Sequence, residues 1–139
     1  MNGWIAVDLD GTLAHYDGWK GAAHIGEPVP LMLERVKKWL AEGKDVRIFT
    51  ARVSLGDPER DAAIIAIRLW CLIHLDQELI ATAEKDFGMI ELWDDRCVQV
   101  EPNTGMSLAE IYANGISGVN AHIKEVIAGL EGEGLLALE

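Results

Sequence analysis

The sequence predicts an α/β fold, a three-layer α/β/α sandwich around a mostly parallel, Rossmann-like sheet. Short apolar runs rich in β-branched residues alternate along the chain with longer segments of helical period. This alternation is typical of a parallel sheet wrapped by helices. The chain has 139 residues, half of them hydrophobic, which suits a single domain with its own core. We therefore expect one domain over residues 1–130 and a loose tail over residues 131–139.

The first part of the chain predicts two strands separated by a loop and a helix. The apolar run "GWIAVDL" at residues 3–9 is typical of a buried strand. Residues 11–28 are rich in glycine and predict a loop. From Val29 apolar residues recur on one helical face, and Gly43 favours the end of that helix. "DVRIFT" at residues 45–50 predicts the second strand.

The later part predicts two helices and further short strands. Asp57 and Pro58 are typical of a helix start, and the helix that follows is apolar almost all round, so we expect it to be deeply packed. "ELIAT" at residues 78–82 and "GMIELWDD" at residues 88–95 predict short strands, and "RCVQV" at residues 96–100 is a further candidate. A last helix is predicted over roughly residues 107–130. Its apolar face contains Ile116, Val119, Ile123, Ile127 and Leu130.

The charge and hydropathy of the chain argue against some functions. A net charge of −11 disfavours general nucleic-acid binding, because phosphate backbones require a basic face. No apolar run reaches the length of a membrane span, and the N-terminus lacks the basic start of a signal peptide. We therefore expect a cytoplasmic protein without a membrane partner.

Two aspartates follow the first apolar run, in "VDLDGT". Residues two apart in a strand face the same side, so Asp8 and Asp10 are expected to enter one space at the carboxyl edge of the sheet, where open parallel sheets place their sites. Two carboxylates this close repel each other and resist burial. A divalent cation removes both costs, and oxygen ligands suit Mg²⁺. An Asp-Gly turn at Gly11 is the plainer interpretation, but the full pattern Asp-x-Asp-Gly-Thr favours a site.

Four motifs in order give the chain a resemblance to the haloacid dehalogenase (HAD) superfamily, which consists mostly of phosphohydrolases. "DLDGT" is similar to the first motif. "VRIFT" supplies the hydroxyl residue of the second motif as Thr50, and "AEKDF" supplies the lysine of the third as Lys85. "MIELWDD" is similar to the fourth motif, an acidic pair formed here by Asp94 and Asp95. The resemblance spans about residues 3–100, although Lys85 lies nearer the fourth motif than is usual.

This resemblance implies a Mg²⁺-dependent phosphohydrolase that acts through an aspartyl-phosphate. Asp8 would be the nucleophile, and Asp10 would protonate the leaving group and then take a proton from water. Mg²⁺ would bridge Asp8, the backbone carbonyl of Asp10, Asp94 and the phosphate. Asp95 would hold a metal-bound water or orient Lys85, and Asp94 is favoured as the direct ligand.

The remaining matched residues would bind the phosphate or the substrate. Lys85 would neutralise the nucleophile and the phosphate. The Thr50 hydroxyl and the backbone N–H groups of Ala51 and Arg52 would hold phosphate oxygens. The Arg52 side chain would either touch the phosphate or the substrate, or be a solvated charge. In this superfamily the loop after the first motif forms a flap over the site. The flap candidates here are Trp19, Lys20 and His24.

Within the superfamily the chain resembles the capless branch. Residues 12–50 hold one loop and one predicted helix, and residues 50–85 hold one predicted helix and a short strand. Neither interval leaves room for a cap domain of usual size. An open site suits a large phosphorylated substrate, such as a polymer end or a protein. Alternatively, another subunit covers the site, which would make the chain a homo-oligomer.

Other functions are alternatives on the same fold. One is a catalytically idle protein that binds phosphate or metal, and another is phosphotransfer to an acceptor other than water. A receiver-type signalling domain is disfavoured, because its adjacent acidic pair comes early and here the pair comes late. Carbon–halogen cleavage has no use for Asp10 or Mg²⁺, and phosphomutases usually need a cap to exclude water.

Overall fold

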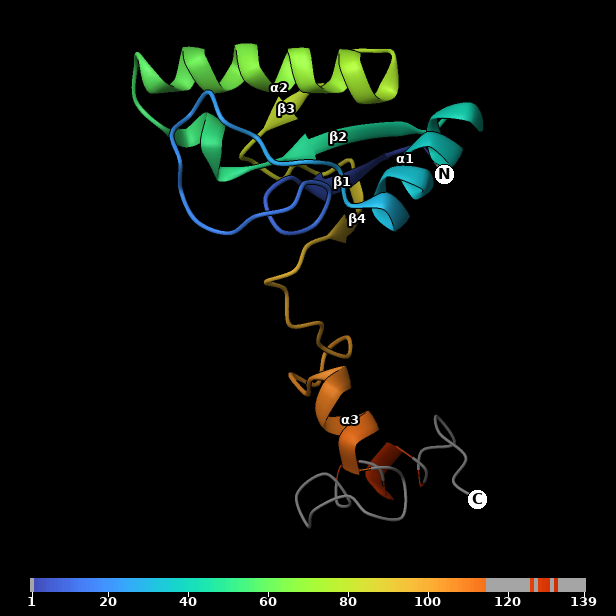
Figure 1. Ribbon diagram of the computed structural model, residues 1–139. Coiled ribbons are helices and arrows are strands. Elements are labelled where there is room, and N and C mark those ends of the chain that lie inside the picture. Colours follow the sequence, from blue (N-terminus) through green and yellow to red (C-terminus); the bar gives the residue numbers. More distant parts are fainter. Residues whose placement is uncertain (1, 115–125, 127, 131, 133–139) are drawn as a thin grey trace. The chain divides into compact units, whose positions relative to one another are not determined.

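The computed structural model describes residues 2–114, 126, 128–130 and 132. The chain divides into two compact units, Met1–Asp95 and Arg96–Glu139. The first unit contains a four-stranded parallel sheet with its helices (Figure 1). The second contains the short helix α3 (Leu108–Asn114) (Figure 1).

The sheet has the strand order β3-β2-β1-β4, with all pairings parallel (Figure 1). Its strands are β1 (Trp4–Asp8), β2 (Asp45–Phe49), β3 (Ala81–Thr82) and β4 (Met89–Trp93). β1 lies between β2 and β4, and its first four residues are all buried. A run of buried residues without alternation is the pattern of a strand that is covered on both faces.

Two helices cover one face of this sheet. They are α1 (Pro30–Ala41) and α2 (Glu59–Leu75), the latter preceded by the short 3-10 helix η1 (Ala51–Ser54). Side chains of both helices join Ile5, Val7 and Ile48 of the sheet in one hydrophobic core. The crossovers from β1 to β2 and from β2 to β3 step along the sheet in the same direction. Because such crossovers are right-handed, they place both helices on the same face.

The connection from β3 to β4 covers the other face without a helix. It must cross from one side of β1 to the other, and residues 83–88 make this crossing. Asp86 accepts a hydrogen bond of 2.8 Å from the indole nitrogen of Trp4. The guanidinium carbon of Arg47 lies 4.7 Å from the centroid of the Trp4 ring. Its Nη1 atom lies 3.9 Å from Asp86 Oδ2. These contacts bury Trp4 against the sheet.

The predicted α/β fold with a parallel sheet and flanking helices is confirmed. Residues 9–44, between β1 and β2, form a loop and α1, and residues 50–80, between β2 and β3, contain η1 and α2. Neither interval holds a cap domain. Within the part of the chain that the structure describes, no helix is both long and apolar enough to cross a membrane.

Two expectations about α2 are wrong. Asp57 does not cap the helix, which begins at Glu59 with no side-chain cap. In the first turn the Arg60 N–H donates to the backbone carbonyl of Gly56 at 3.0 Å. Nor is the helix packed all round, since only one of its sides meets the sheet. Its outward side exposes Ile65, Leu69, Leu72 and Ile73.

In the second unit, residues 96–100 do not form the additional strand that was a candidate. Val100 makes a single antiparallel bridge with Ser107 instead. The turn between them contains Asn103 and Gly105, both with positive φ. The predicted last helix starts as expected at α3, where the Glu110 N–H donates to the Ser107 hydroxyl (3.0 Å). Most of that helix, and of the expected tail over residues 131–139, lies outside the described residues.

The core makes the substitution Ile48→Ala a direct test of the fold. Ile48 is fully buried, so the variant should lose about 2–5 kcal/mol of unfolding free energy through lost apolar contact and a residual cavity. Ile73→Ala is the matched control, because Ile73 is 71% exposed on α2 and should change stability by only about 0.5 kcal/mol. Denaturant unfolding measures both, and equal losses would contradict the packing described here.

Candidate active site

The register of the sheet brings the predicted site residues to one edge. Asp8 ends β1 and pairs with Phe49 of β2, so Thr50 follows directly beside it. On the other side Val7 pairs with Trp93 of β4, which places Asp94 next to Asp8. The carboxyl ends of three parallel segments therefore converge at Asp8.

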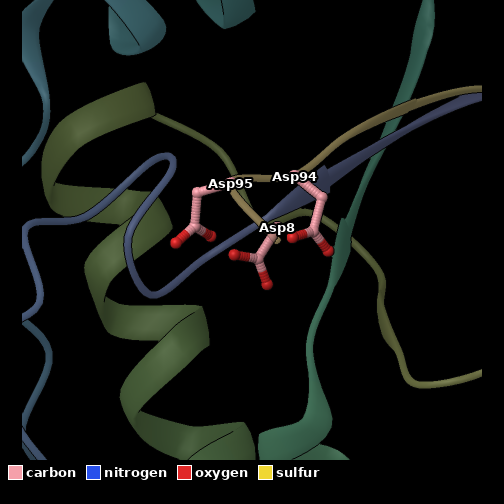
Figure 2. A group of neighbouring side chains, drawn as sticks. All are labelled: Asp8, Asp94 and Asp95. Carbon is pink, nitrogen blue, oxygen red and sulfur yellow. The ribbon is translucent and has the colours of Figure 1, made fainter. Parts of the chain in front are cut away.

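Three carboxylates meet at this point. Asp8, Asp94 and Asp95 each offer an oxygen, and these atoms all lie within 4.8 Å of one another. Figure 2 shows Asp8 at the end of β1 with Asp94 and Asp95 beside it. Clustered carboxylate oxygens are the donors that hard divalent cations such as Mg²⁺ prefer, and the cation would relieve their mutual repulsion. The donor set therefore fits the predicted Mg²⁺.

The electrostatics of Asp8 reflect this crowding. Partial burial, the charge of Asp94, and the hydrogen bond and charge of Asp95 together raise the pKa of the Asp8 carboxyl from 3.8 to about 7, with burial as the largest cause. The hydrogen bond from Thr12 opposes this shift of the pKa. Without a cation, Asp8 is therefore held partly protonated near neutral pH.

Thr12 is a site residue to which sequence reasoning assigned no role. Its hydroxyl lies 3.3 Å from Asp8 Oδ2 and 3.2 Å from Asp95 Oδ1, and it accepts a hydrogen bond of 3.0 Å from the Asp95 N–H. One hydroxyl proton can serve only one carboxylate at a time, so Thr12 links the two acids from between them. The available signal was its place in "DLDGT", four residues after Asp8.

Gly11 makes room for the third carboxylate. Its φ is +92°, a conformation that favours glycine, and a Cβ at this position would lie 2.6 Å from Asp95 Oδ2. The sharp exit that the sequence predicts after β1 is therefore present. The absence of a side chain here also allows Asp95 to approach β1.

Asp10 lies outside this cluster of three carboxylates, because its own carboxylate is paired with Arg52. The Arg52 Nε and Nη2 atoms donate to the two Asp10 oxygens at 2.7 and 2.9 Å. Arg52 is 5% exposed, so this is a buried, two-pronged ion pair rather than a solvated charge. The two aspartates of the first motif thus occupy different environments at the same edge.

The second motif forms a compact turn next to Asp8. Thr50 is buried and caps η1, its hydroxyl oxygen accepting the Arg52 N–H at 3.2 Å. The hydroxyl proton of Thr50 is left to donate elsewhere, as binding a phosphate oxygen requires. Two backbone N–H groups were predicted to hold phosphate. The N–H of Arg52 donates to the Thr50 hydroxyl oxygen in this structure. Ala51, the residue of the other N–H, is exposed.

Lys85 lies three residues after the end of β3, in the connection that crosses to β4. Its side chain is exposed, and within the described part of the chain it makes no ion pair. Its assignment to the third motif stays a prediction.

The flap candidates lie in one loop. The Trp19 ring packs 5.0 Å from the Arg52 guanidinium, and the Lys20 ammonium pairs with Asp17 at 3.0 Å. The His24 carbonyl accepts a hydrogen bond from Arg52 at 2.8 Å. Lys20 and His24 also line an open cavity of about 530 Å³ between this loop and the start of α2. The other lining residues are Gly21, Ala22, Ala23, Pro58, Glu59 and Ala62.

Comparison with known proteins adds little to this picture. No protein-family model matches the chain, and a search of curated proteins gives no match. Among solved structures, the chain is similar to a conserved protein coded by a locus from Bacteroides thetaiotaomicron, at 21% identity and a TM-score of 0.45. The likeness covers 96% of this chain and 93% of that one.

The raised pKa of Asp8 predicts an unusual effect of Asp8→Asn in chelator. Between about pH 4 and 7 the folded chain holds a proton that the unfolded chain has released, so stability falls as the pH rises through this window. The asparagine side chain of the variant has no carboxyl proton to release. The variant should therefore have a higher Tm than the wild type at pH 8, and the difference should vanish near pH 4.

Asp86→Asn is the control, because its expected change in Tm at pH 8 has the opposite sign. The hydrogen bond from Trp4 is the largest cause that lowers the pKa of Asp86, so its charged form stabilises the fold above the unfolded pKa. This variant should lower the Tm at pH 8. A loss of Tm at pH 8 for Asp8→Asn as well would contradict the crowding of the three carboxylates.

Gly11→Ala should weaken binding of Mg²⁺ by roughly 10–100-fold, the range for residues that support metal ligands, because its methyl group would displace the Asp95 carboxylate. Gly43→Ala is the control: Gly43 also has a positive φ, of +77°, but a Cβ there meets no atom within 4 Å. Isothermal titration calorimetry measures both affinities. Unchanged affinity in Gly11→Ala, or no binding by the wild type, would count against the cation site.

Proposed function

We propose that the chain is a Mg²⁺-dependent phosphohydrolase of the HAD type that acts through an aspartyl-phosphate on Asp8. The observation that carries this proposal is the convergence of Asp8, Asp94 and Asp95 at one sheet edge. Asp10 and Thr50 lie at the same edge, next to the end of β1. These residues would supply the carboxylate nucleophile, the acid and the hydroxyl that phosphoryl transfer through a carboxylate requires, with Lys85 as the proposed cation.

Asp8, Asp94 and Asp95 are the residues that would hold Mg²⁺. When bound, the ion supplies positive charge that offsets the three carboxylates and the incoming phosphate. It would also favour the ionised form of Asp8, which is the form that can act as a nucleophile. Thr12 accepts a hydrogen bond from the Asp95 N–H and donates its one hydroxyl proton to either the Asp8 or the Asp95 carboxylate, which keeps the two acids in place.

In the first step an oxygen of Asp8 bonds to phosphorus while the bond from phosphorus to the ester oxygen breaks. Asp10 gives its proton to the departing oxygen, and the Thr50 hydroxyl and the Lys85 ammonium hold the phosphate. In the second step water attacks the phosphorus and Asp10 takes a proton from it. Inorganic phosphate leaves, and the Asp8 carboxylate is restored.

The lack of an inserted domain in residues 9–80 bears on the substrate. A site without a cap accepts the phosphorylated end of a large molecule, such as a polymer or a protein. A second copy of the chain that covers the site is the alternative arrangement.

Phosphate release from a panel of phosphorylated compounds tests this function. The panel should contain sugar phosphates, nucleotides, phosphopeptides and oligonucleotides phosphorylated at either end, each assayed with Mg²⁺ and with chelator. Turnover should require Mg²⁺, and Asp8→Asn should lower kcat by at least roughly 10³-fold, as expected when a nucleophile is removed. Asp61→Asn, on the exposed first turn of α2, should leave turnover unchanged.

A folded, Mg²⁺-loaded chain that releases no phosphate from any compound would count against the phosphohydrolase. Beryllium fluoride, which mimics an aspartyl-phosphate, then gives the second readout. If it also failed to bind, a catalytically idle phosphate- or metal-binding protein would be the better account.

A further inference from the structure

We propose that Arg52 is a positioning residue, which holds the acid Asp10 in place and ties it to the loop that contains Trp19, Ala22 and His24. This inference rests on the proposed function, since it concerns the acid of that reaction. It assigns the Arg52 side chain to Asp10 rather than to the phosphate.

The contact with Asp10 has the geometry of a rigid fork. Arg52 Nε donates to Asp10 Oδ2 at 2.7 Å, and Nη2 donates to Oδ1 at 2.9 Å. Two parallel hydrogen bonds fix the carboxylate in rotation as well as in distance. Each carboxylate oxygen keeps a further lone pair that the fork does not use.

The rest of the guanidinium is bound to the loop. Nη1 donates to the Ala22 carbonyl at 3.1 Å, and Nη2 donates to the His24 carbonyl at 2.8 Å. Together with the fork, this engages four of the five N–H donors of an arginine. The Trp19 ring covers the guanidinium at 5.0 Å. A side chain with these partners and 5% exposure is not arranged to receive a phosphate.

The backbone of Arg52 is fixed by the residue that faces the phosphate. Its N–H donates to the Thr50 hydroxyl oxygen at 3.2 Å, within the turn that starts η1. One short segment therefore carries the predicted phosphate ligand Thr50 and the arginine that orients Asp10. The acid and the phosphate site are set relative to each other by this turn.

The loop that Arg52 holds also forms one wall of a cavity. Ala22 and His24, whose carbonyls Arg52 holds, also line the open cavity of about 530 Å³. A leaving group that enters this cavity would contact the loop that shares Arg52 with the acid. Arg52 thus couples the wall of the cavity to the carboxyl that protonates the leaving oxygen.

Two phosphate esters separate this role from a general structural one. Phenyl phosphate has a poor leaving group and needs the acid, whereas dinitrophenyl phosphate has a good leaving group and does not. General acids contribute about 10²–10⁴-fold, so partial misplacement in Arg52→Lys should lower kcat/KM for phenyl phosphate by at least roughly 10-fold. For dinitrophenyl phosphate the change should stay within about threefold, as it should for Asp10→Asn.

A double variant provides the second comparison. If Arg52 acts through Asp10, then Arg52→Lys should add less than about threefold to the loss already caused by Asp10→Asn with phenyl phosphate. Arg47→Lys is the matched control, because Arg47 also forks onto an aspartate, Asp45, and stacks on a tryptophan, but lies on β2 away from Asp10. It should leave kcat/KM for both esters unchanged.

Equal losses for the two esters in Arg52→Lys, or losses that multiply in the double variant, would overturn the inference. A wild type that hydrolyses neither ester and no compound of the phosphate-release panel would overturn the proposed function instead. If Arg52→Lys does not fold, NMR of the arginine Nε–H groups decides the question. One slowly exchanging signal should move in Asp10→Asn and stay in Asp61→Asn, and the lack of any such signal would overturn the ion pair.

Discussion

Mutual repulsion among Asp8, Asp94 and Asp95 is the constraint to which the surrounding structure responds. The parallel register of β1 and β4 brings Asp8 beside Asp94, because Val7 pairs with Trp93 one residue before them. Gly11 and Thr12 then accommodate Asp95, the first by leaving space and the second by hydrogen bonding. Burial of Asp8, together with the remaining repulsion from Asp94 and Asp95, raises the pKa of Asp8. Such a cluster is suited to a divalent cation.

The two aspartates of "DLDGT" are divided between opposite electrostatic environments. Asp8 faces two further carboxylates, whereas Asp10 faces a buried guanidinium. Neighbouring acids with different surroundings are the usual basis for different roles in one reaction. The division depends on Arg52, which lies on η1 directly after β2.

The scaffold behind this site is small. α1 and α2 cover one face of the sheet, and residues 83–88 cover part of the other without a helix. The outward side of α2 keeps large aliphatic residues in contact with solvent. Rigidity at the site therefore comes from the fully buried central strand β1, from which Asp8 emerges, rather than from a thick surrounding core.

Local chemistry in the sequence was sufficient for much of the fold and for the residues of the cluster. Strands, α1 and the end of α1 at Gly43 follow from hydrophobic period and glycine conformation, and parallel strands necessarily share one carboxyl edge. Contacts between distant residues were decided by tertiary structure. Arg52 and Asp10 are 42 positions apart, and no spacing rule links them. Likewise, the apolar sequence of α2 could not reveal which of its sides would meet the sheet, because burial depends on what packs against a helix and not on the helix alone.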